Sequence, residues 1–215
     1  MIEFFFDCSS PWTYIAFRKI QPLAVDLQTS IEWRPVLVGG IFNSVNKGVY
    51  AAREDMNSAK NRYLLKDVRD SANHAGLQIK FPPDVFPVNS VRAMRGCVWV
   101  AQDAEARTRH IDFIEETFSA YFTANKDISQ DEVLVQICRQ VGIDPARFLA
   151  GIALADVKNS LKANTDEAIR RGAFGSPTFF VGDDMFFGSD RLELVSSAVE
   201  RAGSASATEH PKRQS

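Results

Sequence analysis

The residues best placed for chemistry follow an aromatic run near the start of the chain, which continues as Asp7-Cys8-Ser9-Ser10-Pro11. The run itself, Phe4–Phe6, predicts a strand buried on both faces of a sheet, because it is short and unbroken. Ser10 is a favoured N-cap, and Pro11 suits the first position of a helix. The first N–H groups of such a helix carry partial positive charge, so this corner predicts a site for an anion or a thiolate.

Ser10 has two interpretations. As a helix cap it needs no further function. As a site residue, its hydroxyl would donate a hydrogen bond to a ligand thiolate, which lowers the pKa of the thiol and favours its nucleophilic form. No G-x-S-x-G elbow surrounds Ser10 and no histidine lies near it in the sequence, which argues against an acylated serine nucleophile.

Residues 10–13, Ser-Pro-Trp-Thr, resemble the active-site corner of the thioredoxin superfamily. Redox members of that superfamily have cysteines at the first and fourth of these positions, and both are absent here. The wider pattern Phe-Asp-x-x-Ser-Pro-x-x-Tyr, with Asp7, Ser10, Pro11 and Tyr14, is similar to 2-hydroxychromene-2-carboxylate isomerases and kappa-class glutathione transferases. The resemblance implies that Ser10 is the catalytic residue and holds the sulfur of bound glutathione.

Two motifs near the C-terminus carry the same resemblance. At Ser176-Pro177, the resemblance implies a cis-proline whose preceding residue pairs through its backbone with the cysteinyl part of the ligand, although an ordinary trans X-Pro turn would have the same sequence. Residues 188–191, Gly-Ser-Asp-Arg, resemble the segment that binds the γ-glutamyl end of glutathione, so Ser189 and Asp190 are expected contacts. Without the resemblance, these two residues are only a helix start.

The middle of the chain adds further expected glutathione contacts. Lys60-x-x-Tyr63-x-x-x-Asp67 resembles a family motif whose lysine binds a glutathione carboxylate, although an exposed helix lysine would give the same pattern. Asn46 is expected because family members have an asparagine in the loop after Gly-Gly-Ile-Phe, here residues 39–42.

A second group of residues is expected to face the other substrate. Asn89, Ser90 and Arg92 follow a Pro-rich turn, and an arginine suits the carboxylate of an acidic organic molecule through paired hydrogen bonds. A helix cap followed by a solvated arginine would have the same sequence.

The composition excludes several classes of protein. A formal net charge of -2 gives no electrostatic case for binding nucleic acid or an anionic membrane. No apolar run approaches the roughly 20 residues of a membrane helix, and the start of the chain lacks the features of a signal peptide. Cys8, Cys97 and Cys138 lie far apart, and the histidines have no ligand spacing, so we expect no disulfide framework and no metal. Cys8 is expected to be a buried thiol, and the protein is expected in the cytoplasm.

The elements that must position these residues begin with strand, helix, strand. A helix is expected from Pro11 to about Leu27, and a second strand over Ile31–Val38, with Gly39-Gly40 closing the unit. Helices are then expected over residues 59–75, 90–103, around 111–121, 129–142, from 144, and 157–171. The fourth of these would open with a capping box, Ser129 to Glu132.

Strands return only near the end of the chain. Residues 178–181 and 185–187 flank Gly182-Asp183-Asp184, which predicts a hairpin. Ser189 is expected to cap a closing helix, and the polar residues after Gly203 predict a tail without structure.

The predicted architecture is therefore α/β: a thioredoxin-like domain (βαβ…ββα) interrupted by an all-helical insertion domain. Residues 1–42 and 174–203 would form the split thioredoxin-like domain, residues 43–173 the insertion, and residues 204–215 a disordered tail. The resembling family has the same layout.

The resemblance implies a glutathione-dependent cis–trans isomerase that interconverts a 2-hydroxychromene-2-carboxylate and a trans-benzylidenepyruvate by reversible thiolate addition. Its partners would be glutathione, a small aromatic carboxylate and a second copy of the chain, since homodimers are typical of the family. Two alternatives remain open: a kappa-like glutathione transferase or peroxidase, and a redox-inactive DsbA-like binding protein.

Overall fold

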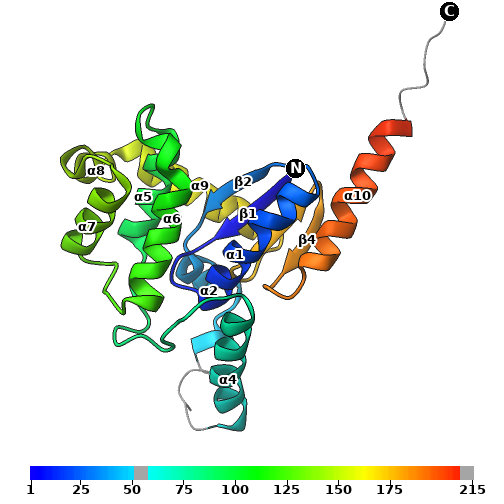
Figure 1. The fold of residues 1–215 in the computed structure, drawn as a ribbon, viewed down its shortest axis with the longest axis horizontal. Helices are drawn as coiled ribbons and strands as arrows, with labels where there is room; N and C mark the ends of the chain where they lie inside the picture. Colours follow the sequence, from blue (N-terminus) through cyan, green and yellow to red (C-terminus); the bar gives the residue numbers. More distant parts are fainter. Residues whose placement is uncertain (51–57, 209–215) are drawn as a thin grey trace, which may run out of the picture.

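A mixed β-sheet forms the centre of the protein (Figure 1). The computed structural model describes residues 1–50 and 58–208, and within them the sheet has the strand order β2-β1-β3-β4. The central strand β1 (Ile2–Phe6) runs parallel to β2 (Ile31–Pro35) and antiparallel to β3 (Thr178–Val181). The edge strand β4 (Asp184–Phe187) pairs antiparallel with β3. The first and last parts of the chain therefore build one sheet, as predicted.

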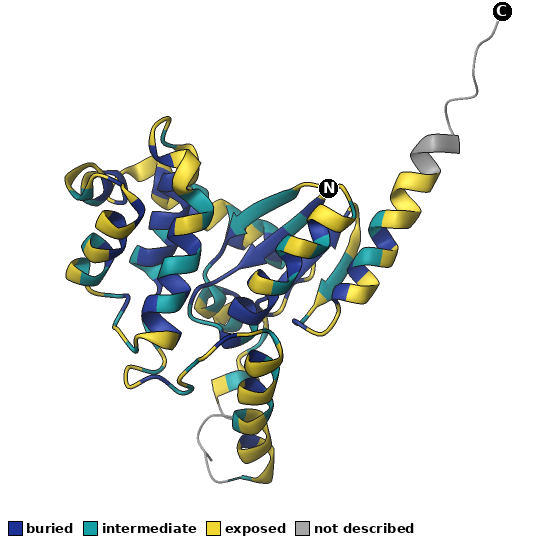
Figure 2. Ribbon diagram, in the orientation of Figure 1, coloured by how far each residue is buried: buried dark blue, intermediate teal, exposed yellow. Residues whose placement is uncertain are grey.

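Helices cover both faces of this sheet, and the side chains of β1 alternate between them. Ile2, Phe4 and Phe6 share a core with α1 (Pro11–Asp26) and α10 (Leu192–Thr208). Phe5 points to the other face, where α2 (Val38–Val45) and α9 (Ala155–Arg170) pack. Burial on both sides explains why the strand is apolar at every position after Glu3, and Figure 2 shows it dark blue between the helices.

The remaining helices form a body beside the sheet. They are α4 (Ala59–His74), α5 (Val91–Gln102), α6 (His110–Phe118), α7 (Asp131–Val141) and α8 (Pro145–Gly151), with short η1 (Ala106–Arg109) and η2 (Ser119–Thr123) segments. Figure 1 shows α5 to α8 packed together, while α4 projects away from the sheet. Within residues 1–50 and 58–208, no helix is both long and apolar enough to cross a membrane.

The second strand is shorter than predicted. It ends at Pro35, and Gly39-Gly40 lies inside α2 instead of closing the unit. The N–H of Val38 donates to Oδ2 of Asp7 at 2.8 Å, and Ile41 is buried against the sheet. These contacts favour a helix here, and the predicted domain boundary after residue 42 falls inside it.

Two predicted caps are also wrong. Helix α7 begins at Asp131 with Gln130 as N-cap, because Asp127 already accepts the N–H of Ser129 at 2.9 Å and holds that residue in a turn. Helix α10 begins only at Leu192, so Ser189 does not cap it.

The end of the chain also departs from the predicted tail. Helix α10 continues to Thr208, into the segment expected to lack structure. The rest of that segment, residues 209–215, lies outside the described residues.

Candidate functional site

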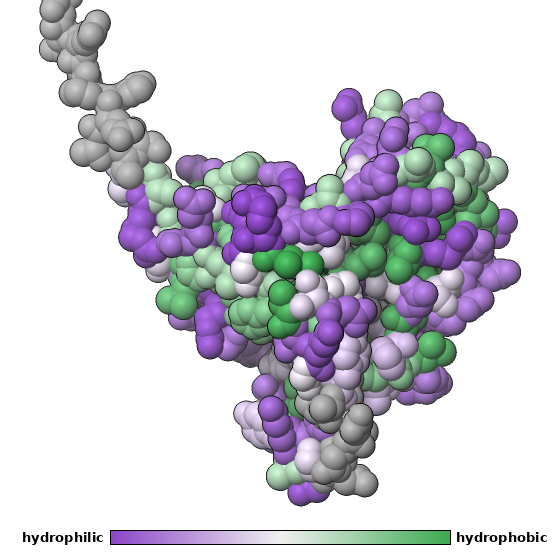
Figure 3. Space-filling view, turned by 180° about the vertical axis from the view of Figure 1, so that it is seen from behind, coloured by the Kyte–Doolittle hydropathy of each residue, from purple (hydrophilic) through white to green (hydrophobic). Residues whose placement is uncertain are grey.

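A cavity of about 770 Å³ opens beside the turn that joins β1 to α1. Its wall comes from that turn, from α2 and α4, from the loop before α5 and from the approach to β3. Figure 3 shows apolar side chains gathered in the middle of the rear face, which is hollowed above α4. The residues that line the cavity include Ser10, Trp12, Phe42, Asn46, Tyr50, Lys60, Tyr63, Asp67, Phe81, Phe86, Asn89, Ser90, Phe174, Gly175, Ser176 and Phe187.

Ser10 lies at the N-terminus of α1, as predicted. Its Oγ accepts a hydrogen bond from the N–H of Thr13 at 3.3 Å, and Pro11 occupies the first turn. The same Oγ donates to the carbonyl oxygen of Ser176 at 3.1 Å. The hydroxyl is half-buried in the cavity wall at the positive end of a helix, which suits a thiolate ligand.

Ser176 joins the two halves of the sheet domain at this corner. The Ser176–Pro177 bond is cis, which confirms the prediction. Oγ of Ser176 lies 2.9 Å from Oγ1 of Thr13 and accepts the N–H of Asp7 at 3.1 Å. Thr13, at the position of the second redox cysteine, is thus a buried polar contact between α1 and this loop.

Asp7 is a buried carboxylate whose role the sequence did not reveal. Oδ1 accepts the N–H and the hydroxyl of Ser9, both at 2.9 Å. Oδ2 accepts the N–H of Val38 at 2.8 Å and the hydroxyl of Ser90 at 3.0 Å. Burial raises the pKa of Asp7, and these hydrogen bonds act in the opposite direction. The carboxylate therefore holds the corner, α2 and α5 together behind the cavity.

Most predicted site residues meet in this cavity. The structure brings together Ser10, Asn46, Lys60, Asn89, Ser90 and Ser176. Nδ2 of Asn46 donates to the carbonyl of Phe174 at 3.1 Å, which fixes it beside Gly175. The motif residues Lys60, Tyr63 and Asp67 all line the cavity from one side of α4. Ser90 lines it as well, but its hydroxyl is donated to Asp7.

Other predicted residues lie outside the lining. Arg92 was expected to face the substrate, but its Nη2 lies 2.5 Å from Oδ1 of Asp131 on α7. Arg92 lies in the first turn of α5, where it meets Asp131 at the start of α7. Ser189 is buried and Asp190 is exposed with Oδ2 2.5 Å from Nη1 of Arg191.

Pro177 is the remaining predicted residue that does not line the cavity. It is buried, and its carbonyl accepts the N–H of Gly188 at 3.1 Å. Its place is therefore behind Ser176, where it links β3 to the segment after β4.

The aromatic part of the wall was not predicted. Three aromatic pairs line the cavity, with ring centroids 4.4 Å (Phe174–Phe187), 5.2 Å (Phe81–Phe86) and 6.4 Å (Phe42–Tyr50) apart. A Cβ at Gly175 would lie 2.8 Å from Cε2 of Phe187, so glycine permits this packing. The repeated Phe-Pro dipeptides at 81–82 and 86–87 are the one sequence signal that pointed here. Such a wall favours flat apolar ligands beside the hydroxyl of Ser10.

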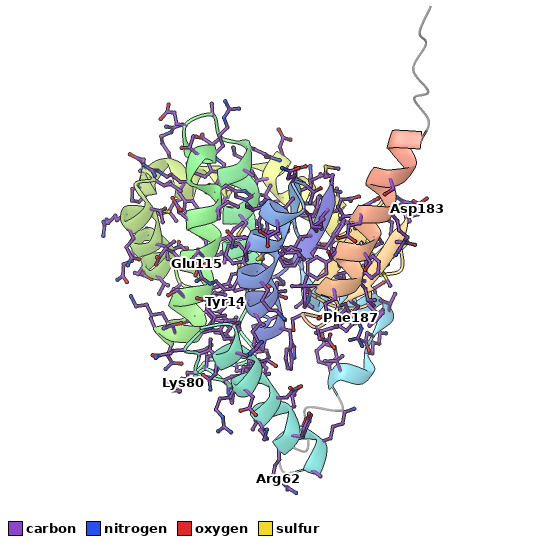
Figure 4. All side chains as sticks on the ribbon, turned by 45° about the vertical axis from the view of Figure 1, so that its right-hand side comes forward. Tyr14, Arg62, Lys80, Glu115, Asp183 and Phe187 are labelled. Carbon is purple, nitrogen blue, oxygen red and sulfur yellow. The ribbon has the colours of Figure 1, made fainter. Side chains whose placement is uncertain are left out.

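Tyr14 belongs to the recognised pattern but does not line the cavity. Figure 4 shows it beside Glu115 of α6, and its hydroxyl donates to Oε1 of that residue at 3.4 Å. Burial, and secondarily the charge of Glu115, raise the pKa of Tyr14 to about 12. Tyr14 therefore ties α1 to the helical body as a neutral phenol.

Cys8 is buried, as predicted, and is not a candidate nucleophile. Its N–H donates to Sδ of Met94 at 3.2 Å. Burial, with a smaller effect of neighbouring Cys97, raises the pKa of the Cys8 thiol well above its ordinary value. Among residues 1–50 and 58–208, no three His, Cys, Asp or Glu side chains are grouped as metal ligands would be.

Known proteins are similar to this chain over nearly its whole length. The family model described as DSBA-like thioredoxin domain matches residues 1–200. Glutathione S-transferase kappa 1 from Homo sapiens is 29% identical over 210 residues, covering 90% of this chain and 88% of that protein. 2-Hydroxychromene-2-carboxylate isomerase from Pseudomonas putida is 25% identical over 201 residues, covering 94% and 95%.

Solved structures show the same fold. A selenomethionine structure of 2-hydroxychromene-2-carboxylate isomerase superposes with a TM-score of 0.79 at 24% identity, covering 98% of this chain and 99% of that one. A probable DsbA oxidoreductase from Streptomyces coelicolor gives a TM-score of 0.72 at 19% identity, covering 100% and 92%.

Proposed function

Since this chain belongs to the DsbA-like thioredoxin family, we propose that it is a glutathione-dependent enzyme in which the hydroxyl of Ser10 stabilises the glutathione thiolate. The proposal is supported by relatives at about 25–29% identity that are isomerases and kappa-class glutathione transferases. Ser10 and Thr13 replace the cysteines of the redox members, so a disulfide cannot form at this corner. A thiol-using enzyme with this corner must take its sulfur from a ligand.

The observation that carries the proposal is the position of Ser10. It caps α1, lines the cavity and lies 3.1 Å from the carbonyl of Ser176. A tripeptide thiol can place its sulfur at Ser10 and its cysteinyl backbone along Ser176. Lys60 and Asn46 line the same cavity and could bind a carboxylate and a polar backbone group. Ser189 and Asp190 are proposed for the γ-glutamyl end; they follow Phe187, which lines the cavity, by two and three residues.

The reaction proposed first is cis–trans isomerisation of a 2-hydroxychromene-2-carboxylate-type substrate. Glutathione supplies the thiolate for reversible addition to a conjugated carbon, which allows rotation about the former double bond. Ser10 donates a hydrogen bond to the sulfur when it is anionic, before addition and after elimination. The aromatic wall binds the ring of the substrate and excludes water. A homodimer in the cytoplasm is part of the same proposal.

A kappa-like transferase is the second candidate, and Arg92 is the observation that favours it. This arginine pairs with Asp131 instead of lining the cavity, so the expected partner of a substrate carboxylate is engaged elsewhere. An uncharged electrophile would need no such partner.

Product analysis tests the proposal. With glutathione and a 2-hydroxychromene-2-carboxylate, an isomerase yields the trans-benzylidenepyruvate and leaves the amount of glutathione unchanged. A transferase instead consumes one glutathione for each stable thioether. Turnover of neither an isomerisable substrate nor an aromatic electrophile would refute an enzymatic role of this kind and favour a binding protein.

Ser10→Ala tests the assigned role. A hydrogen bond to a charged group contributes about 1.5–3 kcal/mol, so kcat should fall roughly 10- to 150-fold if the bond is made to the anionic sulfur. The affinity for S-methylglutathione, which has no thiolate, should change little. Equal losses in both quantities would mean that Ser10 only shapes the site.

A further inference from the structure

The hydroxyl of Ser10 is already committed in this structure. A serine hydroxyl has one proton, and here that proton is directed to the carbonyl of Ser176, 3.1 Å away. The oxygen accepts the N–H of Thr13 at 3.3 Å. Ser10 therefore has no second proton for a sulfur, and it must leave the carbonyl of Ser176 before it can stabilise a thiolate.

The carbonyl of Ser176 would then lose its hydrogen bond from Ser10 unless another donor replaced it. Among residues 1–50 and 58–208, Ser10 Oγ is the donor that this carbonyl has, and the N–H of Ser176 meets no acceptor. Ser176 is buried apart from where it lines the cavity, so an abandoned carbonyl would lack a protein partner. Its loss would oppose the new bond from Ser10 to the sulfur.

Ser176 itself is held in place. Its Oγ is bound to Oγ1 of Thr13 at 2.9 Å and to the N–H of Asp7 at 3.1 Å. The side chain is thus anchored in the protein, while the residue lines the cavity. A fixed residue of this kind can pair through its backbone N–H and C=O with an extended peptide, as a neighbouring strand would.

We propose that an amide N–H of the thiol ligand takes over the carbonyl of Ser176 and so releases the hydroxyl of Ser10 to the ligand sulfur. Before binding, the bond is Ser10 O–H to Ser176 C=O. Afterwards, the ligand N–H occupies that carbonyl, and the Ser10 O–H donates to sulfur. No buried group loses its partner in this exchange.

The inference rests on the proposed function and narrows it. Ser10 acts on thiols whose cysteinyl nitrogen is an amide N–H, and it leaves simple thiols almost unactivated. The specificity for a peptide thiol thus comes from the state of Ser10 as well as from contacts at the ends of the ligand.

The test uses two ligands and two proteins. The ligands are glutathione and its depsipeptide analogue, in which an ester oxygen replaces the amide N–H between the γ-glutamyl and cysteinyl parts. The proteins are the wild type and Ser10→Ala. The ultraviolet absorbance of the thiolate, followed against pH at saturating protein, gives the pKa of each bound thiol.

With glutathione, we expect the bound thiol to have a pKa at least about one unit lower in the wild type than in Ser10→Ala, a tenfold change in thiolate stability. With the analogue, the two proteins should agree within a few tenths of a unit. An equal Ser10-dependent lowering for both ligands would overturn the inference. No lowering with glutathione itself would instead refute the proposed function.

A second measurement covers weak binding of the analogue, and a second variant covers poor folding of Ser10→Ala. If the analogue binds too weakly to saturate, the same four combinations are compared by kcat/KM, where Ser10→Ala should lower the value at least tenfold with glutathione and less than twofold with the analogue. If Ser10→Ala folds poorly, Ser10→Gly replaces it, since glycine as N-cap costs a helix only a few tenths of a kcal/mol.

Discussion

The contact between Ser90 and Asp7 offers a clean test of how the site is held together. The Ser90 hydroxyl donates to Oδ2 of Asp7 at 3.0 Å, and both residues are buried. Ser90 is the N-cap of α5, but its side chain makes no capping bond, and its backbone is helical. Ser90→Ala therefore removes one hydrogen bond to a buried carboxylate and leaves the local backbone unstrained.

The expected loss follows from that single bond. A hydrogen bond to a charged group contributes about 1.5–3 kcal/mol, and alanine regains up to about 0.5 kcal/mol through its better helix propensity. The free energy of unfolding should therefore fall by about 1–3 kcal/mol at neutral pH. Asp7 is fully buried, so solvent does not screen the interaction.

The effect of Ser90→Ala should depend on pH. Burial raises the pKa of Asp7, while the bond from Ser90 lowers it. With a folded pKa above the unfolded one, the stability due to Asp7 is fully present below the unfolded pKa and is lost as pH rises through the folded pKa. Losing the Ser90 bond raises the folded pKa further. The difference between wild type and Ser90→Ala should therefore grow as pH rises through that value and shrink below it.

Urea unfolding at several pH values, from neutral down to the lowest at which both proteins fold, measures this directly. Ser197→Ala is the matched control, because Ser197 is exposed on α10 and donates only to the backbone of its own helix. Its effect should stay within about 0.5 kcal/mol. A Ser90→Ala loss below 0.5 kcal/mol, or one that is the same at every pH, would contradict the role assigned to Asp7.

Four further substitutions test individual residues. Gly151→Ala should lose about 1–3 kcal/mol of stability in urea unfolding, because the added Cβ would lie 2.1 Å from Nε1 of buried Trp99. Gly203→Ala should instead gain up to about 1 kcal/mol of stability, because the added Cβ would meet no neighbouring atom within 4 Å. Lys60→Ala should weaken glutathione binding roughly two- to fivefold in calorimetry, less at high salt, and an unchanged affinity would remove Lys60 from the site. Arg171→Lys should lower the free energy of unfolding by about 1–3 kcal/mol, because the guanidinium contacts Oε2 of Glu3 at 2.6 Å and lies 3.7 Å from the ring centroid of Phe180. Stability equal to wild type would show that only the charge of Arg171 matters.

The sequence predicted the parts of the fold that local patterns determine. The apolar run Phe4–Phe6, the cap Ser10 with Pro11, and the hairpin around Gly182 are short motifs with their own physical preference. The prediction was wrong at Gly39-Gly40, which was expected to end the unit but lies inside a helix that contacts Asp7 and the sheet. The capping box predicted at Ser129 does not form either, because Asp127 accepts the N–H of Ser129. Neighbouring contacts outweighed local propensity in both cases.

The sequence predicted the site only where a motif or a resemblance marked its residues. Ser10 and Ser176, 166 positions apart, were paired through resemblance, and the structure places them in hydrogen-bond contact. The bond from Ser90 to Asp7 spans 83 positions and has no local signature. Arg92 was predicted to face the substrate, and in the structure it pairs with Asp131 on a distant helix. Such long-range contacts depend on how helices pack, which no window of sequence contains.

Titration calorimetry with glutathione and with S-methylglutathione shows whether the protein binds glutathione and recognises its sulfur as a thiolate at Ser10. We expect glutathione to bind, the methyl cap to weaken binding, and Ser10→Ala to remove most of the difference between the two ligands. Equal binding of both ligands to the wild type, or binding of neither, would refute the role of Ser10 as the residue that holds the thiolate.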